Sequence, residues 1–404
     1  MDTKQNDKEW GVIRNNNGEW VSIDNAVFVS ELEKAIIEIR AAQLGKKITF
    51  HHGPDNSLWY YKQEAADIFA AGSHRTKITY RKLNIKKAMD SKKIPLKYSG
   101  DKLFKRNARK HQSDFRTNVL NAPFDSNHKF GKYGAFLMPE DAKNGKNFCE
   151  AFRPEILDCI KLRYPQLTIT KRDELFANML RSEHIPWNLF VPMMQDYKAA
   201  AQVLNEIIGK TEIEEITDIR IEWAPDKTVC LNDNTSFDTY IEYLNDGKKC
   251  GIGIEVKYTE EGYPFGVKER KEVMEKDDSK YACITRSCGL FIPEIAEKPI
   301  RETPLCENSY RQIWRNHILG ASMINNKDLP KDMIEKFHSI TIYPKGNPHF
   351  GKVLPEYEKF LTDKGKSSFG YITIEDLIDL IEKYFPKTEK FQNWIQYLKQ
   401  RYPF

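Results

Sequence analysis

The sequence predicts a mixed α/β fold in which a helix precedes three consecutive strands, and a second helix and a further strand follow them. Alternating apolar and polar residues over 215–223 and within 237–258 are typical of strands. Apolar residues recur at helical spacing over 171–190 and 312–323. A hydrophobic content of 40% with 12% aromatic residues excludes a disordered chain, and 404 residues suffice for two or three domains.

The first helix is expected over residues 171–190, where Leu175, Phe176, Met179 and Leu180 lie at helical spacing. Pro186 should kink or end it. The first strand is expected over 215–223, in which isoleucines alternate with charged residues.

Residues 237–258 are typical of a β-hairpin, with a turn-forming segment at 245–249 between two strands. Because successive side chains of a strand point to opposite faces, Glu255 and Lys257 share one face of the second strand. Asp238, on the first strand, can join them there if the register allows. Two carboxylates and an ammonium group would then meet on one surface of the sheet.

This set of side chains suits the hydrolysis of a phosphodiester, which requires a divalent cation on oxygen ligands and relief of charge on the phosphate. Asp238 and Glu255 would hold the metal, with the backbone carbonyl of Val256 as a further ligand. Lys257 would orient the attacking water or neutralise developing charge. The alternative is ordinary ion pairing on a solvated sheet face, although Glu255 and Lys257 interrupt an otherwise apolar strand.

Two elements follow the hairpin, namely the helix over residues 312–323 and a strand over 340–344 that ends at a proline. Two more helices are expected near the end of the chain. One begins after Thr373 as its N-cap, and the last covers approximately 390–401.

The spacing of Asp238 and Glu255-Val256-Lys257 resembles the signature of the PD-(D/E)XK restriction-endonuclease-like superfamily, although Phe237 stands where the literal pattern has proline. The resemblance implies a restriction-endonuclease-like αβββαβ core, Mg²⁺ as cofactor with Mn²⁺ as a substitute, and Glu183 as a further catalytic acid on the first helix. Segments 181–190, 253–260 and 312–316 are similar to a group of uncharacterised bacterial nuclease-like proteins in this superfamily. The resemblance covers roughly residues 130–385.

Positive charge is concentrated ahead of this core, although the whole chain has a formal net charge of only +5. Residues 75–116 contain fifteen Lys or Arg and three Asp. Such a density favours contact with a phosphate backbone, while a solvated helical face is the alternative. The residues expected to bind nucleic acid are Arg81, Lys82, Lys86, Lys87, Lys105, Arg106, Arg109 and Lys110, together with Gln312 and Arg315 on the second core helix.

The chain is expected to divide into a small N-terminal module (1–60), a basic, mostly helical region that contacts nucleic acid (61–134) and a nuclease-like domain with C-terminal helices (135–404). In the first module, residues 14–18 should form a tight turn between short strands, and 28–43 an amphipathic helix. No apolar signal segment or run of eighteen apolar residues is present, which predicts a cytoplasmic protein without membrane contact.

The function predicted from these observations is a Mg²⁺-dependent DNA endonuclease, acting on double-stranded DNA in defence against foreign DNA. A homodimer is plausible for double-strand cutting. One alternative is a nucleic-acid-binding or assembly protein whose nuclease fold is weak or inactive. Another is a structure-selective DNA nuclease or an RNA nuclease, because both would share the same active site.

Overall fold

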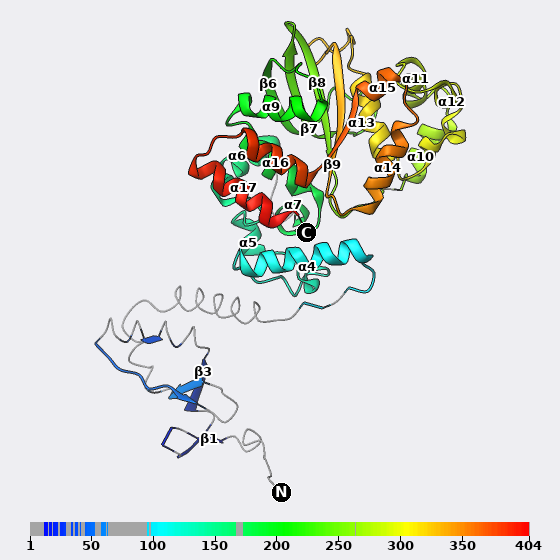
Figure 1. The fold of residues 1–404 in the computed structure, drawn as a ribbon. Coiled ribbons are helices and arrows are strands. Elements are labelled where there is room, and N and C mark those ends of the chain that lie inside the picture. The colour runs from blue at the N-terminus through cyan, green and yellow to red at the C-terminus, as the bar shows by residue number, and fades with distance from the viewer. Residues whose placement is uncertain are drawn as a thin grey trace. The chain divides into compact units, whose positions relative to one another are not determined.

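The computed structural model describes residues 98–166, 173–262 and 264–403, with shorter stretches between residues 12 and 63 and at 95–96 (Figure 1). Its contacts separate residues 1–92 from residues 93–404, so the chain contains two compact units. The larger unit contains every element of the predicted core.

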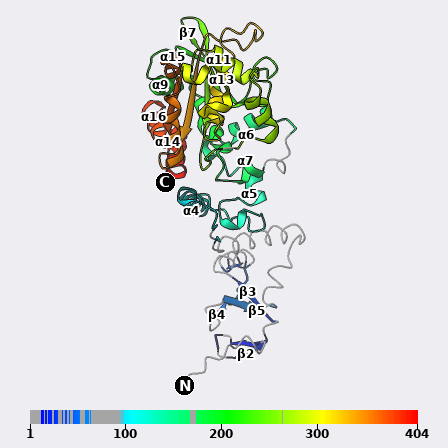
Figure 2. The same cartoon turned by 90° about the vertical axis from the view of Figure 1, so that its right-hand side faces the viewer.

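A five-stranded mixed sheet forms the centre of the larger unit (Figures 1 and 2). Its strands are β6 (Glu215–Trp223), β7 (Phe237–Asn245), β8 (Lys248–Val256), β9 (Lys336–Tyr343) and β10 (Phe369–Thr373), in the spatial order β10-β9-β8-β7-β6. β6, β7 and β8 form an antiparallel meander, whereas β9 and β10 run parallel to β8. The mixed α/β fold predicted from the sequence is confirmed.

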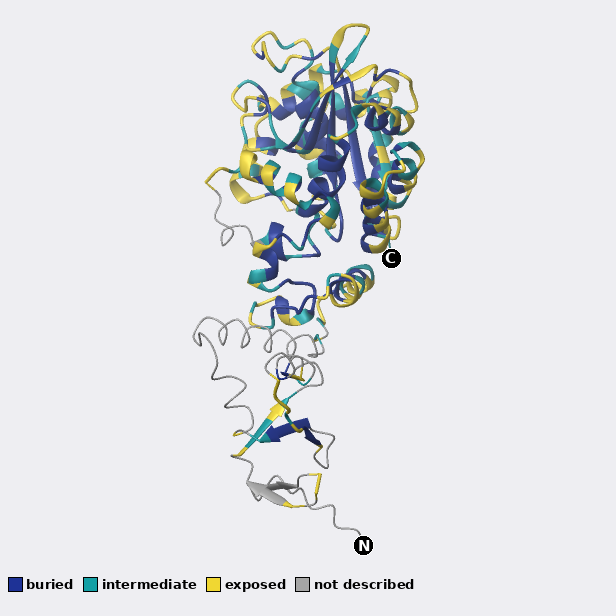
Figure 3. Ribbon diagram, turned by 90° about the vertical axis from the view of Figure 1, so that its left-hand side faces the viewer, coloured by how far each residue is buried: buried dark blue, intermediate teal, exposed yellow. Residues whose placement is uncertain are grey.

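Helices cover both faces of this sheet, and a separate apolar core lies on each side (Figures 1 and 3). One core includes residues of α8 (Ile185–Met193), α9 (Tyr197–Ile208), α16 (Ile374–Tyr384) and α17 (Glu389–Arg401). The other includes residues of α11 (Lys280–Ser287), α13 (Arg311–Ala321) and α14 (Pro348–Glu358). Because Ile252, Ile254 and Val256 belong to the first core, the opposite face of β8 is turned toward α13.

The prediction of one continuous helix over residues 171–190 is wrong. Residues 173–193 instead form α7 (Asp173–Ala177), the short 3₁₀ helix η6 (Ser182–His184) and α8. The interruption comes at Asn178, which pairs with Phe136 and whose side-chain oxygen accepts a hydrogen bond from the backbone of Leu180. Pro186 lies in the first turn of α8, where its missing N–H costs no helical hydrogen bond.

The later elements agree more closely with the sequence. The predicted helix at 312–323 corresponds to α13, and the Oγ1 of Thr373 accepts a hydrogen bond of 3.1 Å from the backbone of Asp376 at the start of α16. The last predicted helix corresponds to α17. Strand β10 was not predicted, although it extends the parallel part of the sheet.

In the smaller unit, β1 (Val12–Arg14) pairs with β2 (Trp20–Ser22), which confirms the turn predicted between them. β3 (Ala26–Val29), β5 (Leu58–Tyr61) and β4 (His51–His52) form a three-stranded sheet. The helix predicted from residue 28 therefore starts too early, because Phe28 and Val29 lie in β3. Most of the remainder of that predicted helix lies outside the described residues.

The basic region is described only in part. Arg81, Lys82, Lys86 and Lys87 lie outside the described residues. The other four basic residues lie on α4 (Leu103–Asn118), which packs within the larger unit against α17. The division of the chain after residues 60 and 134 stays a prediction. Within the described part of the chain, no helix has the length and apolarity needed to cross a membrane.

Two glycines let α13 approach the sheet closely. A Cβ atom on Gly320 would lie 1.9 Å from the ring of Phe337 on β9, and one on Gly253 of β8 would lie 2.4 Å from the ring of Phe237. The rings of Phe237 and Phe337 contact each other at 5.6 Å between centroids. The absence of side chains at these glycines therefore makes room for the aromatic layer between α13 and the sheet.

We expect Gly320→Ala to lower the free energy of unfolding by about 1–3 kcal/mol, because the added methyl group must displace Phe337 or α13. Gly351→Ala on α14 is the matched control, since a Cβ atom there meets no atom within 4 Å. That substitution should leave stability unchanged or raise it slightly. Urea denaturation of the three proteins measures the difference, and equal stability of the two variants would contradict the packing argument.

Candidate active site

Asp238 and Glu255 face each other across the hairpin. In the register of β7 and β8, Thr239 pairs with Ile254, which places Asp238 opposite Glu255 one position further along. The Oδ2 of Asp238 accepts a hydrogen bond of 2.7 Å from the backbone N–H of Val256. The two predicted carboxylates are therefore brought together as the sequence pattern suggested.

Lys257 completes the predicted cluster. It follows the last residue of β8, it is 3% exposed, and its Nζ donates a hydrogen bond to Oε1 of Glu255. Burial alone would lower the pKa of Lys257, but the carboxylates of Glu255 and Asp238 outweigh burial and raise this pKa above its ordinary value. The side chain is therefore a fixed, buried ammonium group at neutral pH.

The helix α13 forms the wall opposite these strands. Its Asn316 donates a hydrogen bond from Nδ2 to Oε2 of Glu255, so both oxygens of this carboxylate have a donor. Asn316 is 3% exposed and lies one turn before Gly320, whose missing side chain permits the close approach. The sequence did not indicate this contact, because it depends on how the helix packs on the sheet.

Asp238 carries the least compensated charge of the cluster. Its pKa is raised well above the ordinary value by burial and by the negative charges of Glu255 and Glu222. Glu222 lies on β6 directly across from Asp238, since Ile221 pairs with Thr239 and Trp223 with Phe237. Sequence reasoning placed Glu222 on the first strand but did not select it as a site residue. The register between β6 and β7 would have been needed to do so.

A pocket of about 260 Å³ opens beside the two carboxylates. Strand β7, the loop before it, β8 and α13 contribute its lining, which consists of polar residues: Asn234, Thr235, Ser236, Asp238, Glu255, Arg311, Gln312, Arg315 and Asn316. Asp238 is half-buried and reaches solvent on this side. A phosphate group can therefore approach the carboxylates from the pocket.

The donor set fits a hard divalent cation. Two carboxylates and the backbone carbonyl of Val256 could supply oxygen ligands, and a cation would neutralise the negative charges that, together with burial, raise the pKa of Asp238. No group of three or more His, Cys, Asp or Glu side chains suited to a metal occurs among the residues that the structure describes. A cation at this site would therefore need ligands from water or substrate as well.

One protein-family model, described as the PD-(D/E)XK nuclease superfamily, matches residues 99–404. The chain belongs to this superfamily. No curated protein and no solved structure shows significant similarity to it. Membership supports a nuclease that acts on nucleic acid, and nucleases of this superfamily typically use divalent metals.

Glu183, the further catalytic acid that the superfamily resemblance implied, lies on η6 and is half-buried. Its Oε1 accepts a hydrogen bond of 3.0 Å from Arg181. The neighbouring Ser182 donates two hydrogen bonds to Glu260, whose other oxygen accepts one from the backbone of Tyr258. These contacts hold the segment of Glu183 beside the residues that follow Lys257, while the Glu183 side chain pairs with Arg181.

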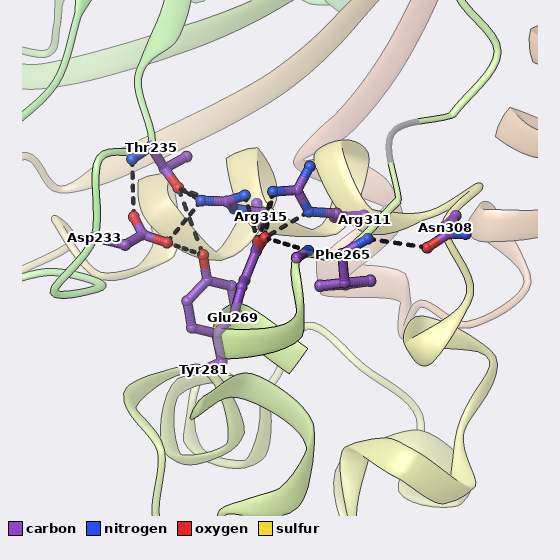
Figure 4. A network of polar contacts seen from close by, with 9 residues as sticks. Asp233, Thr235, Phe265, Glu269, Tyr281, Asn308, Arg311 and Arg315 are labelled. Carbon is purple, nitrogen blue, oxygen red and sulfur yellow. Dashed lines mark hydrogen bonds and ion pairs between the residues drawn. The ribbon is translucent and has the colours of Figure 1, made fainter. Parts of the chain in front are cut away.

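The two predicted contacts on α13, Arg315 and Gln312, differ in their surroundings, and Figure 4 shows those of Arg315. Arg315 lines the pocket but is held by Asp233 at 2.7 Å, by Glu269 at 2.8 Å and by the hydroxyl of Thr235 at 2.9 Å. Gln312 also lines the pocket and is partly exposed. Contact of either residue with nucleic acid stays a prediction.

The described basic residues of α4 also fall into two groups. Arg106 and Lys110 are exposed and Lys105 is partly exposed, whereas Arg109 forms an ion pair of 2.5 Å with the buried Asp101. The same helix contacts the candidate site through Gln112, whose Nε2 donates a hydrogen bond of 2.7 Å to the hydroxyl of Tyr258, next to Lys257. The exposed cations of α4 therefore lie on an element that is hydrogen-bonded to the residues just after the hairpin that carries Asp238 and Glu255.

We expect Asp238→Asn to stabilise the protein at about pH 8 in EDTA by about 1 kcal/mol, or about 2 °C in Tm. The pKa of Asp238 is higher in the folded state, so the stability supplied by its neutral form is present at low pH and is lost as the pH rises through this pKa. Asparagine stays neutral throughout, and the gain should vanish toward about pH 4. Thermal denaturation across this range measures it.

Asp246→Asn is the control, because Asp246 is exposed in the turn between β7 and β8 and its positive φ of 50° also suits asparagine. This substitution should leave Tm nearly unchanged. A lower Tm for Asp238→Asn than for the native protein at high pH would show that the Asp238 carboxylate is already compensated.

Proposed function

We propose that this chain is a Mg²⁺-dependent endonuclease that hydrolyses phosphodiester bonds in double-stranded DNA, with Mn²⁺ able to replace Mg²⁺. The observation that carries the proposal is the convergence of Asp238, Glu255 and Lys257 beside a polar pocket of about 260 Å³. Loss of catalysis would remove the reason to bury three charged groups on a core sheet, since apolar residues there would be cheaper.

Asp238, Glu255 and the carbonyl of Val256 would hold the divalent cation. When bound, the cation lowers the pKa of a water molecule and draws negative charge from the scissile phosphate. Asn316 positions Glu255 by binding one of its oxygens, and the 2.7 Å bond from Val256 positions Asp238. Both carboxylates are thus oriented before a cation or substrate arrives.

Lys257 acts through its charge. Because the pKa of Lys257 is raised, its side chain stays protonated at neutral pH and cannot accept a proton from water. We assign it the stabilisation of negative charge on the phosphate and the orientation of the attacking water. Glu255 holds the ammonium group in place for this role.

The surface that would hold the duplex is the exposed part of α4, including Lys105, Arg106 and Lys110. The hydrogen bond of 2.7 Å from Gln112 of α4 to Tyr258 supports this choice, because it joins α4 to the residues that follow Lys257. Two antiparallel strands must be cut for a double-strand break, so we also propose that the active form is a homodimer. Defence against foreign DNA is the biological role that we propose for this activity.

We expect the native protein with Mg²⁺ to cleave plasmid DNA, and Lys257→Met to reduce the cleavage rate by at least about 100-fold, because the charge that stabilises the phosphate is removed. Lys248→Met is the control, since Lys248 is an exposed lysine on the same strand that pairs with Glu335 at 2.7 Å. Gel assays on supercoiled plasmid, linear phage DNA, single-stranded DNA and RNA measure the rates.

Equal rates for Lys257→Met and the native protein would exclude this site as the catalytic centre. Cleavage of RNA alone would exclude DNA as the substrate. Binding of DNA without any cleavage would instead support a binding protein that keeps the nuclease fold. Discrete fragments from phage DNA would support a restriction-type role in defence.

Replacing Arg106 and Lys110 together by glutamine should weaken DNA binding and reduce the slope of log affinity against log salt concentration by about 1–2, because up to two phosphate contacts are lost. Lys383→Gln with Lys387→Gln, two exposed lysines at the end of α16 and just beyond it, is the charge-matched control. Fluorescence anisotropy at several salt concentrations measures both slopes. Identical slopes for the two double variants would remove α4 from the binding surface.

A further inference from the structure

A carboxylate is held between two arginines at the edge of the candidate active site (Figure 4). Oε1 of Glu269 accepts hydrogen bonds from Nε and Nη2 of Arg311, at 2.9 and 2.6 Å, and from Nη1 of Arg315 at 2.8 Å. Its Oε2 accepts a second bond of 2.6 Å from Nη2 of Arg311. Such a paired arrangement of guanidinium groups around an anion is the geometry that also binds phosphate oxygens.

The two arginines lie one turn apart on α13 and line the same pocket as Asp238 and Glu255. The pocket therefore has an acidic end, suited to a cation and the scissile phosphate, and a guanidinium end. None of the described residues that line it is aromatic. It offers no surface on which a base could stack, so its chemistry suits the sugar-phosphate backbone.

The two arginines differ in what else holds them. Arg315 has further bonds to Asp233 and Thr235, and it stays fixed without Glu269. In the described part of the chain, Arg311 donates hydrogen bonds to Glu269 alone, with its guanidinium group 5.2 Å from the centre of the Phe265 ring. Displacement of Glu269 would thus free the whole of Arg311 and one edge of Arg315.

Glu269 itself lies on a short, exposed helix. The helix α10 (Val267–Arg270) has no buried residue, and it continues directly into a π-helical turn, η7 (Lys271–Glu275). π-helical turns are rare and are frequently found at functional sites. A short exposed helix buries little apolar surface, so moving it aside costs little compared with unfolding the core.

We propose that Arg311 and Arg315 form a binding site for a backbone phosphate next to the scissile one, and that the Glu269 carboxylate occupies this site as a stand-in until the substrate displaces it. The inference rests on the proposed nuclease function and adds to it a non-scissile phosphate contact. The ligand class is a phosphodiester of the nucleic-acid backbone. Recognition at this site is independent of base sequence.

The test is the affinity of Glu269→Gln for a short fluorescent DNA duplex in EDTA, where metal-dependent cleavage does not occur. Removal of the competing charge should tighten binding about fivefold. It should also steepen the slope of log affinity against log salt concentration by about 1, the change expected for one additional phosphate contact. Glu272→Gln is the matched control on the same segment, because Glu272 is exposed and its ion pair within the described part of the chain is with Lys276, at 2.6 Å. It should change the affinity less than about twofold.

The double variant Glu269→Gln/Arg311→Ala identifies the group responsible. Most of the gain from Glu269→Gln should disappear in it, since Arg311 is the guanidinium that is freed as a whole. Persistence of the full gain without Arg311, or a gain of the same size for Glu272→Gln, would overturn the proposal. Arg311→Ala alone should weaken binding about threefold, and this variant keeps the proposal testable if Glu269→Gln does not fold.

A merely structural Glu269 gives a different pattern, in which Glu269→Gln lowers Tm and leaves both the affinity and the salt slope unchanged. That outcome, together with normal cleavage by the native protein, would overturn this inference and leave the nuclease function intact. A native protein that neither binds nor cleaves nucleic acid would overturn both.

Discussion

The clustering of three ionisable side chains, two of them buried, at the end of a hairpin is the constraint on which the rest of this structure depends. Glu255 and Lys257 are 5% and 3% exposed and neutralise each other, but Asp238 remains beside them with a second acid, Glu222, across the sheet. Isolated charges of this kind are costly in a core, and the cost falls only when a partner of opposite charge is present. A cation of the kind that we propose would therefore offset the charge that the chain leaves uncompensated here.

The helix α13 connects this constraint to the fold. Four residues of this helix contact the site or the sheet. Arg311 and Arg315 line the pocket, and Asn316 donates a hydrogen bond to Glu255. Gly320 allows the helix backbone to approach Phe337. A single rigid element thus sets the position of the carboxylate and of both guanidinium groups. A shift of α13 caused by crowding at Gly320 would move all of these groups together, which couples packing in the core to geometry at the site.

The sequence predicted what depends on local pattern and missed what depends on pairing in space. β6 matches its predicted bounds, and Asp238, Glu255 and Lys257 meet, because alternation of apolar residues defines both the strands and their faces. The helix over 171–190 was wrong because a tertiary pairing of Asn178 overrides helical spacing. Glu222 was overlooked because its position opposite Asp238 follows only from the register between β6 and β7. The contacts of Glu269 with Arg311 and Arg315 were also missed, because they join residues that are 42 and 46 positions apart in the sequence.

The balance of charge around the pocket explains why binding of the substrate should depend on binding of the cation, and the reverse. Five carboxylates (Asp233, Asp238, Glu222, Glu255, Glu269) and three cationic groups (Lys257, Arg311, Arg315) lie at the pocket or beside the residues that line it, so the chain alone leaves an excess of negative charge when all are ionised. A phosphate would be repelled by this excess. A divalent cation would offset this excess, and displacement of Glu269 would expose a further guanidinium group. Each of these two changes favours the binding of a polyanion, so cation binding and displacement of Glu269 would strengthen substrate binding together.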